Sequence, residues 1–251
     1  MTPTVFITGG AAGIGAATVR KFAGEGWNVL FSDIDAEAGK ALEAELPGTL
    51  FAEADTRCRE RLEAVVALGV ERFGSLNAVF ANAGIHRKNT VLDISDEEFD
   101  LVVKTNIYGT ANTLRAAVPA IIASGGGSVV LNASDQSFIG KRASFAYGLT
   151  KGAIAQMAKS TALDLAPYRV RVNAVCPGTV RTGIVDGIFS RLSAATGRPV
   201  ADYLADEAAE FPLGRICEPE EVASLVYFLA SENAGFITGS LFPIDGGITA
   251  G

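Results

Sequence analysis

The chain has 251 residues, of which 49% are hydrophobic and 20% are charged, and its formal net charge at pH 7 is −7. This length and apolar content suit one α/β domain with a large core. An acidic chain without a cluster of Lys and Arg residues is a poor partner for nucleic acid, because binding to phosphates requires clustered cations. The same charge disfavours an acidic carrier protein as a partner.

No apolar run reaches the roughly 18–20 residues that cross a bilayer, and no basic stretch followed by an apolar block opens the sequence. The cysteines, Cys58, Cys176 and Cys217, are odd in number and form no CxxC pair, which favours a reducing compartment and predicts no metal site. We therefore expect a soluble, cytoplasmic protein that binds no membrane. A Ser-His-Asp hydrolase would have to use the single histidine, His86, to which we assign no role.

Short β-branched or aromatic runs alternate along the chain with longer helical stretches. We expect strands at 4–8, 28–32, 49–54, 78–81, 128–132, 170–175 and 240–244, and helices at 13–25, 36–46, 57–73, 96–123, 145–166 and 219–230. Strands that are apolar on both sides, such as the one at 128–132, form parallel sheets covered by helices on both faces. The alternation predicts one doubly wound α/β domain over residues 1–251, with right-handed crossovers.

One segment interrupts this alternation. Residues 181–213 form a long polar stretch with charges of both signs and no clear strand. Long insertions of this kind are often lids over a binding site. We predict a substrate lid here; the alternative is a solvated surface excursion.

A glycine-rich turn, TGGAAGIG at 8–15, follows the first expected strand and opens the first helix. Glycines let the backbone turn tightly and approach a pyrophosphate, while the helix start offers unpaired N–H groups to that anion. Asp33 ends the second strand eighteen residues after Gly15, where a carboxylate accepts hydrogen bonds from the adenosine ribose. This carboxylate would repel the extra phosphate of NADP, and its neighbour Ile34 brings no cation. The pattern predicts NAD.

Tyr147 and Lys151 stand four residues apart in YGLTK, a spacing that puts both side chains on one helical face. A free tyrosine has a pKa near 10 and is a poor base at neutral pH; lowering that pKa by about three units requires roughly 4 kcal/mol. One ammonium about 4 Å away supplies a term of this size at an effective dielectric constant of ~20. We therefore expect Lys151, aided by the charge of the oxidised nicotinamide, to turn Tyr147 into a base.

Taken together, these motifs resemble those of the short-chain dehydrogenase/reductase family. The resemblance rests on TGGAAGIG at 8–15, NAG at 82–84, Asn106, Ser134, YGLTK at 147–151 and Pro177-Gly178, and it extends through LAS at 229–231, ITG at 237–239 and IDGG at 244–247. It implies a Rossmann-like fold with a seven-stranded parallel sheet. It also implies an NAD-dependent oxidoreductase that interconverts a secondary alcohol and a ketone.

The resemblance assigns a role to each residue that matches a family motif. Tyr147 is the acid/base, Ser134 binds the substrate oxygen, Lys151 also binds the nicotinamide ribose, and Asn106 holds a water in the proton relay behind Lys151. The other expected dinucleotide contacts are Gly9, Ala12, Gly13, Ile14, Gly15, Asp33, Ile34, Asp55, Thr56, Asn82, Ala83, Gly84, Pro177, Gly178, Val180 and Thr182. Asp55 would touch the adenine, and the residues at 177–182 would hold the carboxamide and a phosphate.

The substrate has a weaker signal. Asp135 and Gln136 follow the catalytic serine, and we read them with Ser134 as possible ligands for a substrate hydroxyl; local capping of the loop is the alternative. Such a pocket favours a small polar hydroxy compound: a polyol, a sugar or a hydroxylated ring. The resemblance further implies a homotetramer built through the helices at 96–123 and 145–166, with Ala153, Ala155, Ala158 and Ala162 permitting close packing.

Three other functions remain. A non-catalytic dinucleotide sensor of the same fold would tolerate loss of Asn106, Ser134 or Tyr147, and all three are present. A sugar-nucleotide epimerase would need a larger C-terminal region and a different glycine spacing. A 3-oxoacyl-carrier-protein reductase would need basic docking residues and usually NADP.

Overall fold

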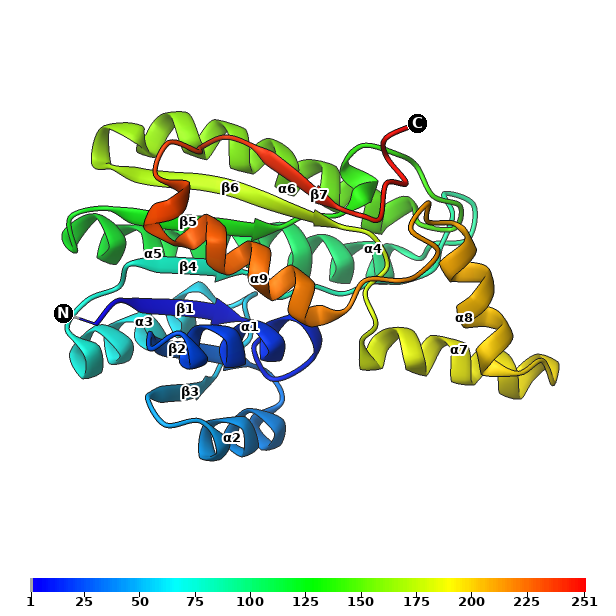
Figure 1. The fold of residues 1–251 in the computed structure, drawn as a ribbon, viewed down its shortest axis with the longest axis horizontal. Coiled ribbons are helices and arrows are strands. Elements are labelled where there is room, and N and C mark those ends of the chain that lie inside the picture. The colour runs from blue at the N-terminus through cyan, green and yellow to red at the C-terminus, as the bar shows by residue number, and fades with distance from the viewer. Residues whose placement is uncertain (1) are drawn as a thin grey trace.

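Seven parallel strands form one sheet in the order β3-β2-β1-β4-β5-β6-β7 (Figure 1). The computed structural model describes residues 2–251, with every side chain in that range except that of Ile184. The strands are β1 (Thr4–Thr8), β2 (Asn28–Asp33), β3 (Thr49–Glu53), β4 (Ala78–Ala81), β5 (Gly127–Asn132), β6 (Val170–Pro177) and β7 (Leu241–Ile244). The predicted seven-stranded parallel sheet is confirmed.

The order of the strands places the binding edge. The chain moves outward from β1 to β3 and then returns to start β4 on the other side of β1. The carboxyl ends of β1 and β4 therefore lie side by side with their following loops diverging, and open α/β sheets bind ligands at such a switch point.

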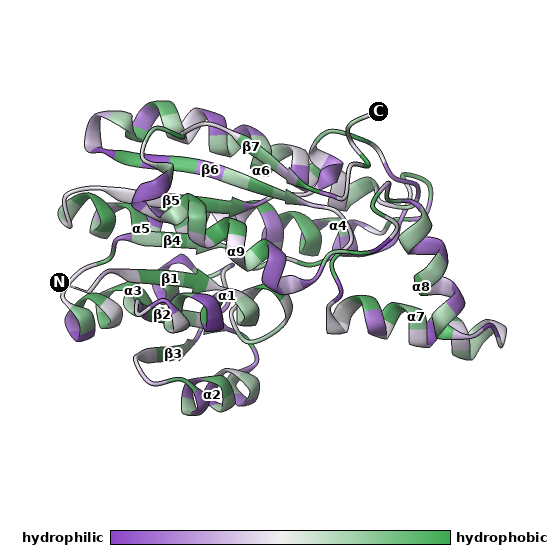
Figure 2. Cartoon of the chain, in the orientation of Figure 1, coloured by the Kyte–Doolittle hydropathy of each residue, from purple (hydrophilic) through white to green (hydrophobic). Residues whose placement is uncertain are grey.

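Helices cover both faces of the sheet because strand side chains alternate between the faces. Phe6, Val79 and Val129 point to one face and pack with α3 (Arg59–Phe73), α5 (Gly109–Ala123) and α6 (Phe145–Leu165). Ile7, Phe80 and their neighbours point to the other, against α1 (Gly13–Gly24), α2 (Ala36–Glu45) and α9 (Pro219–Ala230). The apolar strands between these helix layers are visible in Figure 2.

The helix expected at 96–123 is not one regular helix. It consists of α4 (Asp96–Val103), a π-helical turn at Lys104–Tyr108, and α5. One additional residue in the turn rotates the following helix relative to the first, and single π-turns occur mostly at functional sites. The turn contains Asn106.

The segment expected to form a lid contains two helices, α7 (Gly183–Thr196) and α8 (Val200–Ala209), which project from the sheet beyond its carboxyl edge (Figure 1). They contact one another through the stacked rings of Phe189 and Tyr203, whose centroids lie 6.0 Å apart. The absence of a strand from this segment agrees with the sequence expectation. None of the helices in residues 2–251 combines the length and the apolar character that a membrane span requires.

We predict that Gly15→Ala destabilises the fold, whereas Gly24→Ala on the same helix does not. A Cβ at Gly15 would lie 1.9 Å from the carbonyl oxygen of Gly9, a backbone atom, whereas a Cβ at exposed Gly24 would meet nothing within 4 Å. Overpacking of this kind costs about 2 kcal/mol or more, whereas Ala in place of an exposed helical Gly gains up to about 1 kcal/mol. Unfolding in urea measures both, and equal stability of the two variants would contradict the geometry.

Candidate active site

The glycine-rich turn is held by side chains from the neighbouring strand ends. Gly9 and Gly13 adopt positive φ angles of 64° and 52°, which only glycine adopts without strain. The amide of Asn82, just after β4, donates to the carbonyl oxygens of Thr8 and Gly9, both at 3.0 Å. Asn132, at the end of β5, donates in turn to Asn82 at 2.9 Å. The ends of β1, β4 and β5 are thereby tied together.

The start of α1 offers unpaired donors to an anion. Ala12 precedes the helix and provides no side-chain cap, and the first turn contains no acidic residue. The first N–H groups of a helix have no partner within the helix, and they lie at the positive end of its dipole. Gly13, Ile14 and Gly15 therefore present backbone donors where a phosphate would stabilise the helix end. The expected pyrophosphate site fits this chain.

Asp33 links the end of β2 to the same turn. Its Oδ2 accepts a hydrogen bond from the backbone N–H of Ala11 at 3.0 Å, and its Oδ1 accepts one from that of Asp35 at 3.1 Å. The neighbouring Ile34 side chain is exposed. The Asp33 carboxylate therefore lies beside the glycine-rich turn with no cation among these neighbours, where the adenosine ribose is expected.

The other expected dinucleotide residues follow the sheet edge. Asp55 comes after β3 and forms an ion pair with Arg57 at 2.5 Å, which holds the pKa of that carboxyl below its usual value. Thr56 beside it is buried. Thr182 approaches the turn from the start of α7, since a Cβ added to Gly13 would lie 3.0 Å from its methyl carbon. Val180 is buried in the same loop.

Tyr147 lies in the first turn of α6 and Lys151 follows it one turn later, as the spacing predicted. The Lys151 Nζ lies 5.4 Å from the centroid of the Tyr147 ring. It also donates a 2.6 Å hydrogen bond to the backbone carbonyl of Asn132. The same asparagine that ties the strand ends thus fixes the position of the lysine.

Ser134 lies beside Tyr147, close enough for its hydroxyl to lower the pKa of the tyrosine by hydrogen bonding. Its backbone precedes a short 3-10 turn at Asp135–Ser137 after β5. Ser134, Tyr147 and Lys151 therefore meet at the carboxyl edge of the sheet, as the motif spacing implied.

In the ligand-free site, Lys151 alone does not bring the pKa of Tyr147 toward neutrality. Burial raises the pKa of Tyr147 to about 12; the hydrogen bond with Ser134 opposes this, and the charge of Asp135 adds to it. Burial also lowers the pKa of Lys151 to about 8. Both shifts have the same physical cause, because a site shielded from water disfavours the charged form of each group.

Asn106 connects two elements of the site through its side-chain amide. Its fully buried amide accepts from the Ile85 N–H at 2.8 Å and donates to the Ile85 carbonyl and the Thr150 hydroxyl, both at 3.0 Å. Its side chain therefore joins the loop after β4 to α6, the helix that carries Tyr147. The relay water expected behind Lys151 stays a prediction.

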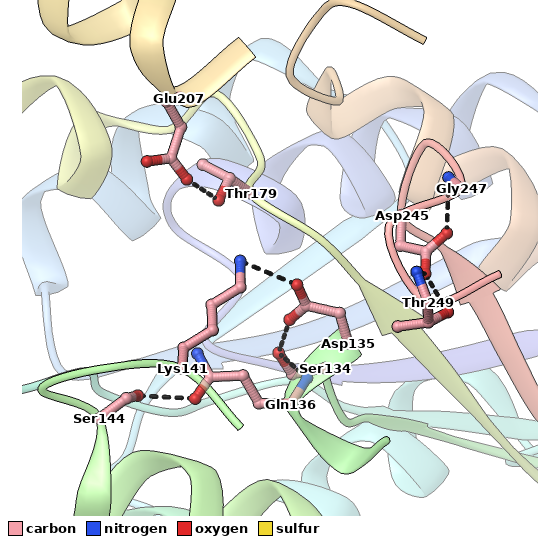
Figure 3. A network of polar contacts seen from close by, with 10 residues as sticks. All are labelled: Ser134, Asp135, Gln136, Lys141, Ser144, Thr179, Glu207, Asp245, Gly247 and Thr249. Atoms are coloured by element: carbon pink, nitrogen blue, oxygen red, sulfur yellow. Dashed lines mark hydrogen bonds and ion pairs between the residues drawn. The ribbon is translucent and has the colours of Figure 1, made fainter. Parts of the chain in front are cut away.

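The residues proposed for the substrate have partners of their own. Asp135 is buried, accepts a 2.7 Å hydrogen bond from Ser134, and forms an ion pair with Lys141 at 2.9 Å. The Gln136 carbonyl oxygen accepts from Ser144 at 2.7 Å. Figure 3 shows this network below Thr179 and Glu207, which lies on α8. Direct contact of Asp135 or Gln136 with substrate stays a prediction.

Sequence reasoning gave no role to two residues of this site. His86 packs its ring edge-on against Tyr147, with 4.7 Å between centroids. Its pKa is lowered by burial and by the nearby cations Lys88, Arg87, Lys141 and Lys151. Its position two residues after Gly84 was the one available signal. Lys141 has no sequence motif, and only the fold brings it to Asp135.

Comparison with known proteins gives a consistent result. A family model described as enoyl-(acyl carrier protein) reductase matches residues 9–249. The chain is 38% identical over 248 residues to an L-fucose dehydrogenase from Mus musculus, covering 98% of this chain and 88% of that protein. It is 35% identical over 246 residues to a 3-alpha-(or 20-beta)-hydroxysteroid dehydrogenase from Mycobacterium bovis, with the same coverage.

A solved structure shares both fold and sequence with this chain. The ligand-free aldohexose dehydrogenase of Thermoplasma acidophilum superposes with a TM-score of 0.91 at 31% identity, covering 100% of this chain and 95% of that one. Members of this group are oxidoreductases that act on hydroxyl groups with a nicotinamide dinucleotide, which the glycine-rich turn and the Ser134, Tyr147 and Lys151 site accommodate. The chain is an oxidoreductase and belongs to the short-chain dehydrogenase/reductase family.

Proposed function

We propose that the protein is an NAD-dependent dehydrogenase that interconverts a secondary alcohol and a ketone, with Tyr147 as the acid/base. The observation that supports this most is the meeting of Tyr147, Ser134 and Lys151 at the carboxyl edge of the sheet, next to the glycine-rich turn. The dinucleotide supplies the hydride acceptor and, when oxidised, a positive charge. The protein supplies the proton chemistry.

In oxidation, the Tyr147 oxygen accepts the proton of the substrate hydroxyl, and in reduction the Tyr147 hydroxyl returns it. The Ser134 hydroxyl binds the substrate oxygen and stabilises the charge that develops there. Lys151, fixed by Asn132, keeps a cation beside the phenol. Because burial, with the charge of Asp135, raises the pKa of Tyr147 to about 12, the phenolate needs positive charge around it to form near neutral pH.

We propose a small polar hydroxy compound as the substrate. Gln136 and Lys141 bring an amide and a charged side chain to the hollow beside the site, and buried Asp135 lies directly behind them. The names of the relatives support this class, since they include L-fucose and aldohexose dehydrogenases and a trans-4-hydroxycyclohexanecarboxylate dehydrogenase that is 33% identical to this chain. A polyol, a sugar or a hydroxylated ring fits these observations.

Residues 181–213 are proposed to form the lid over this substrate. The hydroxyl of Thr179 contacts the carboxylate of Glu207, and Phe211 packs beside Gly178. The base of the segment therefore adjoins the loop after β6, which carries Pro177, Gly178 and Val180.

The homotetramer and the cytoplasmic location also stay predictions. The exposed apolar side chains Tyr108, Leu149 and Leu163, on the two helical segments named for the interface, support assembly. The role given to small residues of α6 is corrected: Ala155, Ala158 and Ala162 are buried within the subunit, where they let α6 approach its own sheet.

We expect Tyr147→Phe to abolish turnover while leaving dinucleotide binding intact, because it removes only the hydroxyl that carries the proton. NADH absorbance during oxidation of a panel of secondary polyols measures turnover, and NADH fluorescence measures binding. Tyr168→Phe, on an exposed tyrosine after α6, is the matched control and should keep full activity. Turnover of the Tyr147 variant at the wild-type rate would overturn the assignment.

We expect NADH to bind at least about tenfold more tightly than NADPH, because the Asp33 carboxylate repels a 2′-phosphate. Asp33→Asn keeps a hydrogen-bond acceptor for Ala11 and removes the charge, so it should reduce this preference severalfold. Asp35→Asn, which alters the exposed cap of α2, should leave it closer to that of the wild type. Fluorescence titration at fixed ionic strength measures both affinities; equal wild-type affinities for the two dinucleotides would contradict the proposal.

A further inference from the structure

The residue after the catalytic serine is a buried carboxylate. Asp135 is 2% exposed, at the first position of the short 3-10 turn that follows β5. A carboxylate removed from water requires a charge or hydrogen-bond partner, since burial of an unpaired charge is very unfavourable. Asp135 has two such partners, one for each oxygen.

The first partner is the hydroxyl of Ser134. It donates to the Asp135 Oδ1 at 2.7 Å, and the Ser134 oxygen accepts from the Gln136 N–H at 3.2 Å (Figure 3). A serine hydroxyl has one proton and two acceptor lone pairs. Because Asp135 accepts that proton, Asp135 fixes the direction of the Ser134 hydroxyl in the ligand-free site. When Ser134 turns its proton to a substrate oxygen, the Gln136 N–H still holds the Ser134 oxygen in place.

The second partner is Lys141, whose Nζ lies 2.9 Å from the Asp135 Oδ2. This oxygen is fully enclosed and accepts no aligned hydrogen bond, so the attraction between the charges holds it. The lysine side chain is only 23% exposed, and its Nζ lies 5.5 Å from the centroid of the Phe211 ring at the base of the lid segment. The pair is thus shielded from solvent, where charges interact strongly.

The loop that carries Lys141 is held in place. The N–H of Asn89 donates to the carbonyl of Ala143 at 3.0 Å, and the Phe145 N–H donates to the carbonyl of Asn89 at 3.2 Å. The Asn89 side-chain oxygen accepts from the Ala146 N–H at 3.2 Å. Ala143 has a φ of 52°, a left-handed conformation that is costly for alanine. The loop backbone, fixed by these hydrogen bonds to Asn89, therefore places Lys141 against Asp135.

We propose that Asp135 and Lys141 form a positioning pair for the catalytic centre, in which Asp135 orients the Ser134 hydroxyl and Lys141 cancels the negative charge that Asp135 would otherwise direct at Tyr147. This inference rests on the proposed role of Tyr147 and adds residues that no motif of the chain identifies. Asp135 supplies a hydrogen-bond acceptor for the Ser134 hydroxyl. Lys141 offsets the repulsion between the Asp135 carboxylate and the Tyr147 phenolate.

The other charged groups around Tyr147 do not replace this pair. Lys151 on α6 is a cation, and burial and nearby cations lower the pKa of His86 after β4. Burial raises the pKa of the Cys176 thiol on β6 to about 11. On α8, the carboxylate of Glu207 contacts Thr179.

The acidic residues of α4 lie toward solvent. Asp96, Glu97 and Asp100 are exposed and Glu98 is partly exposed. Asp100 also pairs with Lys104 of the π-turn. Asp135 is the carboxylate that raises the pKa of Tyr147.

The test is the pH dependence of kcat/KM for alcohol oxidation in four variants of the full-length enzyme. Lys141→Met leaves the Asp135 charge uncompensated, so the midpoint of the rise in activity should move up by about one pH unit. Asp135→Asn keeps the acceptor for Ser134 and removes the charge, so the midpoint should move down by about one unit. The double variant should return close to the wild type. Arg142→Met, on the exposed neighbour of Lys141, should not move it.

A fifth variant separates the acceptor from the charge. Asp135→Ala removes both, so its kcat/KM at the optimal pH should fall about tenfold below that of Asp135→Asn. The pairing would be overturned if the midpoints of Lys141→Met and Asp135→Asn did not move, or if both moved in one direction. Equal kcat/KM values for Asp135→Ala and Asp135→Asn would overturn it as well. Circular dichroism shows whether each variant is folded. An inactive wild-type enzyme would instead contradict the proposed function.

Discussion

The site depends on a short chain of side-chain hydrogen bonds across the carboxyl edge of the sheet. Asn82 holds the glycine-rich turn after β1, Asn132 donates to Asn82, and the Asn132 carbonyl fixes the Lys151 ammonium. Each link bridges neighbouring elements that the chain reaches at distant sequence positions. The turn that would receive a pyrophosphate and the lysine beside Tyr147 are therefore held by the same set of hydrogen bonds.

Within this frame, burial and charge act against each other. The site is shielded from water, which raises the pKa of Tyr147 and lowers that of Lys151. This shielding keeps the tyrosine protonated near neutral pH unless cations surround it, and the charge of Asp135 raises its pKa further. In the proposed mechanism, Lys141, Lys151 and the oxidised dinucleotide would all contribute positive charge near Tyr147. The chemistry depends on the sum of these charges rather than on one lysine.

The alternation of strands and helices predicted the sheet because each strand is buried between two helix layers. That burial is visible in the sequence as a short run of apolar residues. It predicted Tyr147 and Lys151 because helical spacing alone places them together. It missed the π-helical turn around Asn106, which depends on tertiary hydrogen bonds to Ile85 and Thr150. It also missed Lys141, because a held loop determines that contact. The raised pKa of Tyr147 in the ligand-free site could not be read from the sequence, because burial is a property of the fold.

The central claim is that a hydride and a proton leave a secondary alcohol at this site, the hydride to NAD and the proton to Tyr147. The most direct measurement uses a polyol that carries deuterium at its carbinol carbons, with mass spectrometry of the reduced dinucleotide. We predict one deuterium in each reduced NAD and one ketone for each deuterium transferred. Ketone formation without reduced NAD, or deuterium released into water, would contradict the account.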